Sequence, residues 1–294
     1  MHSVSERFDF TGDELAPAYR AAVDAIEAGD LVVMPTDTVY GLAADAFKAD
    51  AVQRLLDAKG RGRDMPPPVL ISVVESLDAL ATDIPDNGRK LCEEFWPGPL
   101  TVICHAQTSL MWDLGETQGT VALRVPDHEN TRELLSRTGP LAVSSANKSG
   151  QPAALDVYDA EEQLGESVAV YLDGGEATGG QPSTIVDLTG DTPRVVRVGA
   201  LTVDQLRAVV PDVAADSDEP PAAETPTEDK PADETPAEDK PADEKPAEDK
   251  PLVDESAEDK PAGVEATGEA VVASKEDDTK TDPDVRPADR GHDS

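Results

Sequence analysis

LVVMPTDTVYGLAADA, residues 31–46, passes directly from an apolar run into polar residues. Its first part, residues 31–35, is short and continuously apolar, which is typical of a buried strand. The triplet Thr36-Asp37-Thr38 follows at the carboxyl end of that strand. Open sheets place ligand groups at this end, so the hydroxyls are candidates to bind a substrate carboxylate or hydroxyl. A plain polar turn after a strand is the competing interpretation.

Apolar runs and turns continue outward from this stretch and predict one mixed domain. Helical spacing predicts helices over residues 17–28, 51–58, 86–95, 129–138, 157–164 and 202–210. Apolar runs predict strands over residues 31–35, 68–74, 100–106, 120–126, 140–145, 168–173, 183–188 and 194–199. Strands mixed with helices indicate an α/β or α+β fold. The two do not alternate strictly, so a purely parallel sheet does not follow.

Two short runs about ninety residues apart, Lys59-Gly60-Arg61 and Ser145-Ala146-Asn147, add charge and polarity. Arg63 extends the first run into a Gly-rich, Pro-bounded loop. Cations this close repel one another unless an anion or solvent stabilises them, and guanidinium groups bind phosphates in a bidentate manner. The loop therefore predicts a polyphosphate site, with a solvated surface loop as the equal alternative. It has no Walker pattern.

Further polar groups interrupt or end other apolar strands. Arg124 lies inside VALRVP, and a charge in such a run needs a ligand or an ion-pair partner. Ser144 and Ser145 end another strand, where small residues allow close approach of a phosphate or ribose. Ser183 and Arg197 repeat the theme. Positive and neutral polar groups of this kind suit charge stabilisation at a phosphorus centre.

The chain divides by composition into residues 1–211 and 212–294. Its 294 residues carry a net charge of −36, of which 28 acidic and 9 basic residues place −19 in the second part. That part is rich in Pro, Glu, Asp and Lys and repeats TPTEDKPADE, TPAEDKPADE and KPAEDKPLVDE. It contains too little apolar surface to offset its ordering entropy. We expect a globular domain followed by a disordered acidic tail, and the acidity disfavours non-specific nucleic-acid binding.

Cysteine and histidine positions indicate no metal centre or nucleophile. Cys92 and Cys104 form no CxxC motif, which favours free thiols in a reducing compartment. His105 and His128 belong to no triad or HExxH pattern. Because no secretory pattern and no run of roughly 20 apolar residues is present, we expect a soluble, cytoplasmic protein with no membrane association.

The motifs PTDTVYGLAADA, KGR, FWPGPLT, ALRVP, SSANKSG, STIVDL and RVG, in this order, closely resemble those of the YrdC-like threonylcarbamoyl-AMP synthases. The resemblance covers about residues 17–210. It implies a YrdC-like twisted mixed β-sheet flanked by helices around a concave, positively lined cavity. It also implies a nucleotidyltransferase that makes L-threonylcarbamoyladenylate and diphosphate from ATP, L-threonine and bicarbonate. A threonylcarbamoyl-transferase complex would then modify the tRNA adenosine adjacent to the anticodon, with at most weak tRNA contact by this chain.

The resemblance also implies roles for individual residues. Catalysis would rest on Lys59 and Arg61, which neutralise the departing pyrophosphate, with Mg²⁺ held mainly by ATP and no tightly bound cofactor. The implied ATP-binding residues are Lys59, Arg61, Arg63, Thr120, Ser145, Asn147 and Arg197. The implied L-threonine-binding residues are Thr36, Ser72, Arg124, Val143 and Ser183, with Arg124 on the carboxylate.

The loop after Arg61 departs from the family pattern. Relatives continue with an Asn-Pro pair and a histidine, whereas this chain reads GRDMPPPVLIS. We expect Arg63 to replace one of those contacts and Ser72 to stand at the histidine position. The second folded domain of larger relatives is replaced here by the acidic tail.

Two other functions stay open at this stage. A carbamoyl-adenylate-forming relative would carry Cys-rich zinc fingers, which two cysteines cannot supply. A YrdC-like RNA-binding module would bind without ATP, with strong salt dependence. The tail suggests a solubilising bristle, which truncation at residue 211 would test.

Overall fold

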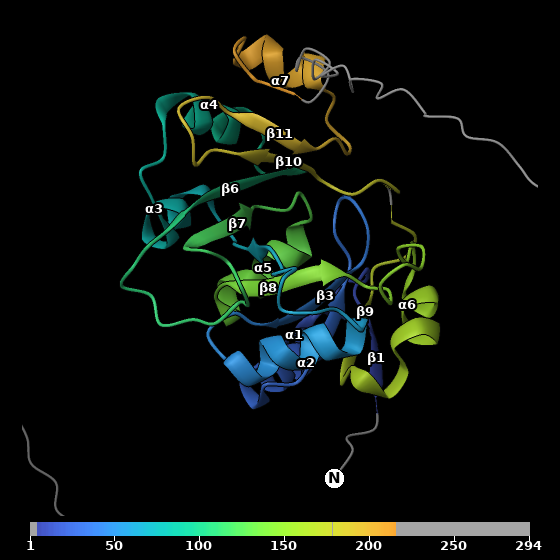
Figure 1. The fold of residues 1–294 in the computed structure, drawn as a ribbon. Coiled ribbons are helices and arrows are strands. Elements are labelled where there is room, and N and C mark those ends of the chain that lie inside the picture. Colours follow the sequence, from blue (N-terminus) through green and yellow to red (C-terminus); the bar gives the residue numbers. More distant parts are fainter. Residues whose placement is uncertain (1–4, 178, 216–294) are drawn as a thin grey trace, which may run out of the picture. The chain divides into compact units, whose positions relative to one another are not determined.

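The computed structural model describes residues 5–177 and 179–215 (Figure 1). The strands are β1 Glu6–Asp9, β2 Val32–Met34, β3 Gly41–Asp45, β4 Val69–Leu70, β5 Ala81–Thr82, β6 Leu100–Ala106, β7 Thr120–Arg124, β8 Leu141–Ser145, β9 Val170–Asp173, β10 Thr184–Asp187 and β11 Arg194–Arg197. The α-helices are α1 Ala16–Ala28, α2 Ala49–Lys59, α3 Leu77–Leu80, α4 Asp86–Phe95, α5 Glu129–Thr138, α6 Val157–Leu164 and α7 Val203–Val209. Two 3₁₀ turns complete them, η1 Val74–Ser76 and η2 Gly165–Ser167. In this part of the chain, no helix is long and apolar enough to cross a membrane.

The strands join in one twisted mixed sheet. Their order is β1-β9-β2-β3-β8-β4-β7-β6-β10-β11, and β5 pairs with β6 outside this path. β9 lies parallel to both β1 and β2, whereas β3 lies antiparallel to β2 and β8. The parallel pairs β4–β7 and β6–β10 alternate with the antiparallel pairs β4–β8, β6–β7 and β10–β11. The mixed fold predicted from the irregular succession of helices and strands is therefore confirmed.

Helices cover both faces of the sheet near β2. Successive side chains of this strand point to opposite faces, so they pack against different helices. Val32 and Met34 pack in a cluster with residues of α1 and α5. Leu31 and Val33 pack in the opposite cluster, with residues of α2 and α6. A third cluster lies among β6, β7, β10 and helices α3, α4 and α7. Figure 1 shows α4 and α7 beside β10 and β11, away from α1 and α2.

Besides the two 3₁₀ turns, the described residues contain three strands and one α-helix that the sequence patterns did not predict, namely β1, β3, β5 and α3. β3 reads GLAAD, and its glycine and alanines have low strand propensity. Pairing with β2 and β8 along both of its edges compensates, because every ladder bond is then available. β5 and α3 have two and four residues, which is too short for any periodic pattern.

The turn after α2 directs the predicted phosphate loop back toward the sheet. Gly60 adopts φ 63° and ψ 40°, the left-handed conformation that ends helices. Its amide donates to the Asp57 carbonyl, and the Arg61 amide donates to the Leu56 carbonyl. Lys59 is thereby the last helical residue, and Arg61 emerges beside β8.

The predicted acidic tail, residues 212–294, lies almost wholly outside the described residues. At its start, Val213 is buried, and the Ala214 amide donates to the Pro193 carbonyl at 2.9 Å. Packing on the domain therefore continues at least to residue 215, just past the predicted boundary at 211.

Candidate active site

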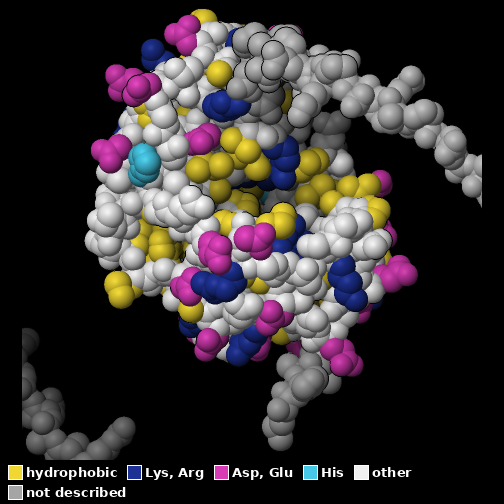
Figure 2. All heavy atoms as spheres, viewed as in Figure 1, with side chains coloured by type: hydrophobic (Ala, Val, Ile, Leu, Met, Phe, Trp, Pro, Cys, Tyr) yellow, Lys and Arg dark blue, Asp and Glu magenta, His cyan; other side chains and the backbone are white. Residues whose placement is uncertain are grey.

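A cavity of about 310 Å³ lies where the edges of several strands and loops meet. It is lined from the β2–β3 loop, the loop after α2, and strands β3, β4, β6, β7, β8, β10 and β11. Figure 2 shows the surface hollowed near its centre, with hydrophobic and Lys or Arg side chains around the hollow. The lining residues are Thr36, Thr38, Val39, Tyr40, Gly41, Arg61, Met65, Pro66, Pro68, Leu70, Thr101, Arg124, Val143, Ser144, Ser145, Pro182, Ser183, Ile185 and Arg197.

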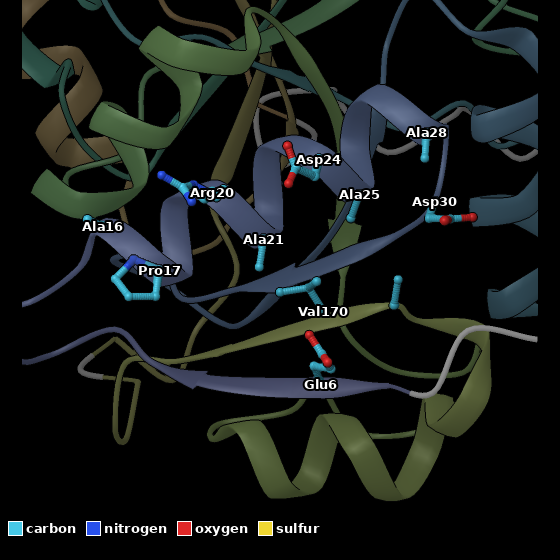
Figure 3. A pocket seen from close by; sticks show the side chains of 11 residues that line it. Glu6, Ala16, Pro17, Arg20, Ala21, Asp24, Ala25, Ala28, Asp30 and Val170 are labelled. Atoms are coloured by element: carbon cyan, nitrogen blue, oxygen red, sulfur yellow. The ribbon is translucent and has the colours of Figure 1, made fainter. Parts of the chain in front are cut away.

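A larger hollow of about 550 Å³ lies elsewhere, between α1 and the strands β1 and β9 (Figure 3). Five of its lining residues are alanines. Figure 3 shows the charged side chains of Arg20, Asp24 and Asp30 pointing away from one another. Because no polar groups converge there, the smaller cavity is the better candidate for chemistry.

The KGR and SAN runs meet through Lys59. Its side chain is 1% exposed. The ammonium donates to the carbonyl oxygens of Ser145 at 2.5 Å and Asn147 at 2.6 Å, and to Oδ1 of Asn147 at 3.3 Å. Asn147 in turn donates its amide to the carbonyls of Lys148 and Gln151. Residues 145–147 are therefore held from behind by a lysine at the end of α2.

This position differs from direct phosphate contact by Lys59. Neither Lys59 nor Asn147 is among the residues that line the cavity, whereas Ser145 is. Burial, followed by the charge of Arg61, lowers the pKa of Lys59 to about 8. In the described structure, the Lys59 ammonium supports the cavity wall from behind, and Ser144 and Ser145 form the surface of that part of the wall.

Arg61 and Arg197 present cations to the cavity without a carboxylate partner among the described residues. Arg61 Nη1 donates to Ser144 Oγ at 3.3 Å, while its buried Nε has no partner in the described structure. Arg197 donates to the Ser183 carbonyl from Nε at 3.2 Å and from Nη2 at 2.9 Å. Burial lowers the pKa of Arg197, and the charge of Arg61 lowers it further. Two neighbouring cations without a counter-ion favour an anionic ligand.

Arg124 is held from three sides. Its Nε donates to the Gly98 carbonyl at 3.0 Å and its Nη1 to Thr38 Oγ1 at 3.0 Å. Nη2 forms an ion pair with Asp37 Oδ1 at 2.5 Å, and the two side chains are 7% and 13% exposed. The sequence left an ion pair and a ligand as alternatives for Arg124. The structure gives it the ion pair and also places it in the cavity wall.

Hydroxyl groups occupy the wall beside Arg124. Thr36 Oγ1 lies 3.0 Å from Thr38 Oγ1 and donates to the Val39 carbonyl at 2.6 Å. A second pair of hydroxyls is formed by Thr101 and Ser183, whose Oγ1 and Oγ lie 2.8 Å apart. All five of these residues line the cavity. The described lining residues include three arginines and no Asp or Glu, so the cavity combines cations with neutral hydrogen-bonding groups.

Thr120 lies outside this cavity, in an adjoining apolar pocket of about 170 Å³. The two pockets share Pro66, Pro68, Thr101 and Ile185. Thr120 begins β7 and Arg124 ends it, which separates them by about 13 Å at the usual rise of a strand. The Thr120 hydroxyl donates to the Thr117 carbonyl at 2.8 Å. Thr120 therefore belongs to an annex of the cavity.

Arg63 and Ser72 are not brought to the cavity. Arg63 pairs with Asp113 and donates to Gln53 Oε1 at 3.3 Å. Ser72 lies past the end of β4, in a separate hollow with residues of α1 and α5. The β4 residue that lines the cavity is Leu70. Ser72, which was expected to stand at the position of a family histidine, therefore lies two residues after Leu70, the residue that lines the cavity.

Sequence reasoning missed Tyr40 and Thr101 as lining residues. Tyr40 lies within the quoted PTDTVYGLAADA run, so its proximity to Thr36 was available as an indication. Thr101 offered no sign, because a threonine inside an apolar strand is ordinary. Among residues 5–177 and 179–215, no group of three or more His, Cys, Asp or Glu side chains could hold a metal ion.

Comparisons with known proteins bear on the same residues. The family model described as Telomere recombination, for Sua5, YciO and YrdC, matches residues 24–199. A Mycobacterium leprae (strain TN) protein named "Putative threonylcarbamoyl-AMP synthase" is 50% identical over 216 residues, which cover 73% of this chain and 98% of that protein. A Pyrococcus abyssi protein named "Threonylcarbamoyl-AMP synthase" is 36% identical over 195 residues, covering 66% of this chain and 57% of that protein.

A solved structure agrees with these sequence matches. The crystal structure of P. abyssi Sua5 complexed with L-threonine matches with a TM-score of 0.69 at 33% identity, covering 72% of this chain and 62% of that one. This chain thus spans less than two thirds of each Pyrococcus protein. The family match includes both the KGR and SAN runs and the arginines of β7 and β11. The chain belongs to the Sua5/YciO/YrdC family.

Proposed function

We propose that this protein is an L-threonylcarbamoyladenylate synthase, which makes threonylcarbamoyl-AMP and pyrophosphate from L-threonine, bicarbonate and ATP. The observation that carries the proposal is a cavity with three arginines, a cluster of hydroxyls and no carboxylate in its lining. Such a site suits a nucleoside triphosphate beside a small hydroxylated anion. The synthase names of the relatives and the threonine complex of a related structure support the choice of substrate.

The reaction needs positioning and charge stabilisation more than a protein nucleophile. The threonine amine and bicarbonate give a carbamate and water. A carbamate oxygen then attacks the α-phosphorus of ATP, and the bond to the pyrophosphate oxygen breaks. The attacking oxygen is already anionic, so a strong protein base is not required after carbamate formation. The pyrophosphate charge that develops is neutralised by cations.

The described residues divide this work between two sides of the cavity. Arg61 and Arg197, which have no carboxylate partner, would receive the phosphates, and Ser145 would bond the nucleotide from the wall that Lys59 supports. Mg²⁺ would arrive with ATP and add charge on the phosphates. The apolar annex at Thr120 would accept the adenine ring, because it is continuous with the cavity and walled by prolines and aliphatic side chains.

The threonine side would be formed by Arg124 and the hydroxyl cluster. The Arg124 guanidinium would bind the substrate carboxylate, and Thr36 and Ser183 would bond its hydroxyl or amine. Val143 lines the same wall and would contact the threonine methyl group. The product would pass to a complex that transfers the threonylcarbamoyl group to tRNA, with activity in the cytoplasm.

Pyrophosphate release tests the proposal directly. Purified protein is supplied with ATP, Mg²⁺ and bicarbonate, with and without L-threonine, beside Arg61→Ala and the control Arg89→Ala. Arg89 forms an exposed ion pair with Asp78, and neither residue lines the cavity. We expect threonine-dependent release that falls by about 10²–10³ in Arg61→Ala and is retained in the control. Release that ignores threonine, or an Arg61→Ala variant as active as the control, would contradict the proposal.

A further inference from the structure

The three cavity arginines differ in their counter-charges. Arg61 and Arg197 bond only to hydroxyl and carbonyl oxygens among the described residues. Arg124 alone is paired with a carboxylate, that of Asp37. The negative charge of Asp37 weakens the attraction of Arg124 for a distant anion. The physical role that remains for Asp37 is to fix the orientation of the Arg124 guanidinium.

Asp37 is itself held firmly in the β2–β3 loop. Just before it, the Pro35 carbonyl accepts from the buried Thr131 hydroxyl of α5 at 2.7 Å. Just after it, the Thr38 carbonyl accepts from the Gly180 amide at 3.0 Å. A Cβ at Gly179 would come within 2.5 Å of the Asp37 carbonyl oxygen, so the backbone at Gly179 packs directly against the backbone of the β2–β3 loop. The backbone on either side of Asp37 is therefore anchored by two separate segments, and Asp37 itself does not line the cavity.

The contacts of Arg124 leave a defined pair of donors. A guanidinium has five N–H groups. Three are used, by the Gly98 carbonyl, Thr38 Oγ1 and Asp37 Oδ1. Two N–H groups remain, one on Nη1 and one on Nη2, and Arg124 lies in the cavity wall. This is the number of donors that a carboxylate accepts in bidentate binding.

We propose that Asp37 is a positioning residue that holds the Arg124 guanidinium in the orientation that receives the substrate carboxylate. The inference rests on the proposed function, since it takes the amino acid carboxylate to bind at Arg124. It goes further in dividing the arginines into two classes. Arg61 and Arg197 attract polyphosphate by uncompensated charge, whereas Arg124 recognises the amino acid through geometry fixed by Asp37.

Steady-state kinetics of pyrophosphate release separate this role from a general structural one. Asp37→Asn keeps the size of the side chain and removes its charge. We expect KM for L-threonine to rise about tenfold to a hundredfold, as for loss of a charge-assisted hydrogen bond, with KM for ATP within about twofold of wild type. The matched control is Asp127→Asn, which removes a carboxylate from the exposed ion pair with Arg132 and should change neither KM.

Asp37→Glu provides the second variant, in case Asp37→Asn does not fold. It keeps the charge but lengthens the side chain, so it should raise KM for threonine less than Asp37→Asn does and again spare KM for ATP. An unchanged threonine KM in either folded variant, or equal changes in both KM values, would overturn the inference while leaving the synthase function standing. Wild-type release without threonine dependence would instead remove the proposed function and this inference with it.

Discussion

Lys59→Met tests whether the buried ammonium holds residues 145–147 in place. Methionine keeps an unbranched side chain but removes the donor to the buried carbonyl and Oδ1 of Asn147, whereas the Ser145 carbonyl still accepts from the Asn147 amide. Each buried acceptor left without a donor costs about 1–3 kcal/mol, or about 2–6 kcal/mol for both. Against this, the pKa of Lys59 falls from 10.5 to about 8, so removing the buried charge recovers about 3 kcal/mol. The expected net loss in unfolding free energy at pH 7 is about 0–3 kcal/mol.

The change of unfolding free energy with pH tests this prediction more sharply than the net difference at pH 7 does. Because the pKa of Lys59 is about 8 in the folded protein and ordinary in the unfolded chain, the unfolded state binds more protons between pH 8 and 10.5. Stability contributed by this group therefore rises with pH across that window and is constant below it. Relative to Lys59→Met, the wild type should gain about 2 kcal/mol of unfolding free energy between pH 7.5 and 9.5.

Urea unfolding followed by tryptophan fluorescence at both pH values measures this difference. Lys48→Met is the matched control, because the Lys48 ammonium also donates to two carbonyls, those of Ile26 and Glu27, but its side chain is 41% exposed. Because Lys48→Met keeps Lys59 and its contacts, its unfolding free energy should still rise between the two pH values. A wild-type advantage over Lys59→Met that stays flat or falls as pH rises would refute the reasoning. Pyrophosphate release by folded Lys59→Met should also fall, since the Ser145 wall loses its support.

Three further predictions concern Ser72, the apolar annex and Arg63. Ser72→Ala should leave KM for threonine unchanged, whereas Leu70→Asn should alter it, because only Leu70 lines the cavity; equal effects in the same kinetic assay would contradict this. Ala122→Phe should fill the apolar annex and raise KM for ATP at least about tenfold, with little change in KM for threonine. Titration calorimetry with ATP checks this, and an unchanged affinity for ATP would contradict it. Arg63→Ala should cost less than about 1 kcal/mol in thermal or urea unfolding, because its ion pair with Asp113 is largely solvated, and a larger loss would show that the pair is structural.

Sequence patterns predicted the long elements well, because burial of one face imposes a period. The helix predicted over 17–28 is Ala16–Ala28, and that predicted over 129–138 is Glu129–Thr138. β3 escaped prediction because its small residues become a strand only when β2 and β8 enclose it. Such pairing joins segments distant in sequence, and local propensity carries no information about it.

The site was predicted in its residue types more than in its contacts. Charged and polar interruptions of apolar strands drew attention to Arg124, Ser183 and Arg197, and all three line the cavity. The burial of Lys59 could not be anticipated, since its three acceptors lie 86 and 88 residues further along the chain. Ser72 was placed by counting along an altered loop, and the end of β4 at Leu70 decides which side chain faces inward.

The order of strands has a consequence for synthesis of the protein. β1 pairs with β9, and β2 pairs with β3 along one edge and with β9 along the other, so β1 and one edge of β2 stay unpaired until residues 170–173 are made. At translation rates of about 5–20 residues per second, that wait lasts roughly ten to thirty seconds. Contacts of such long range also slow folding in vitro. Nascent chains halted before β9 should therefore expose unpaired strand edges and depend on chaperones, and the cavity should appear only once most of the domain has emerged from the ribosome.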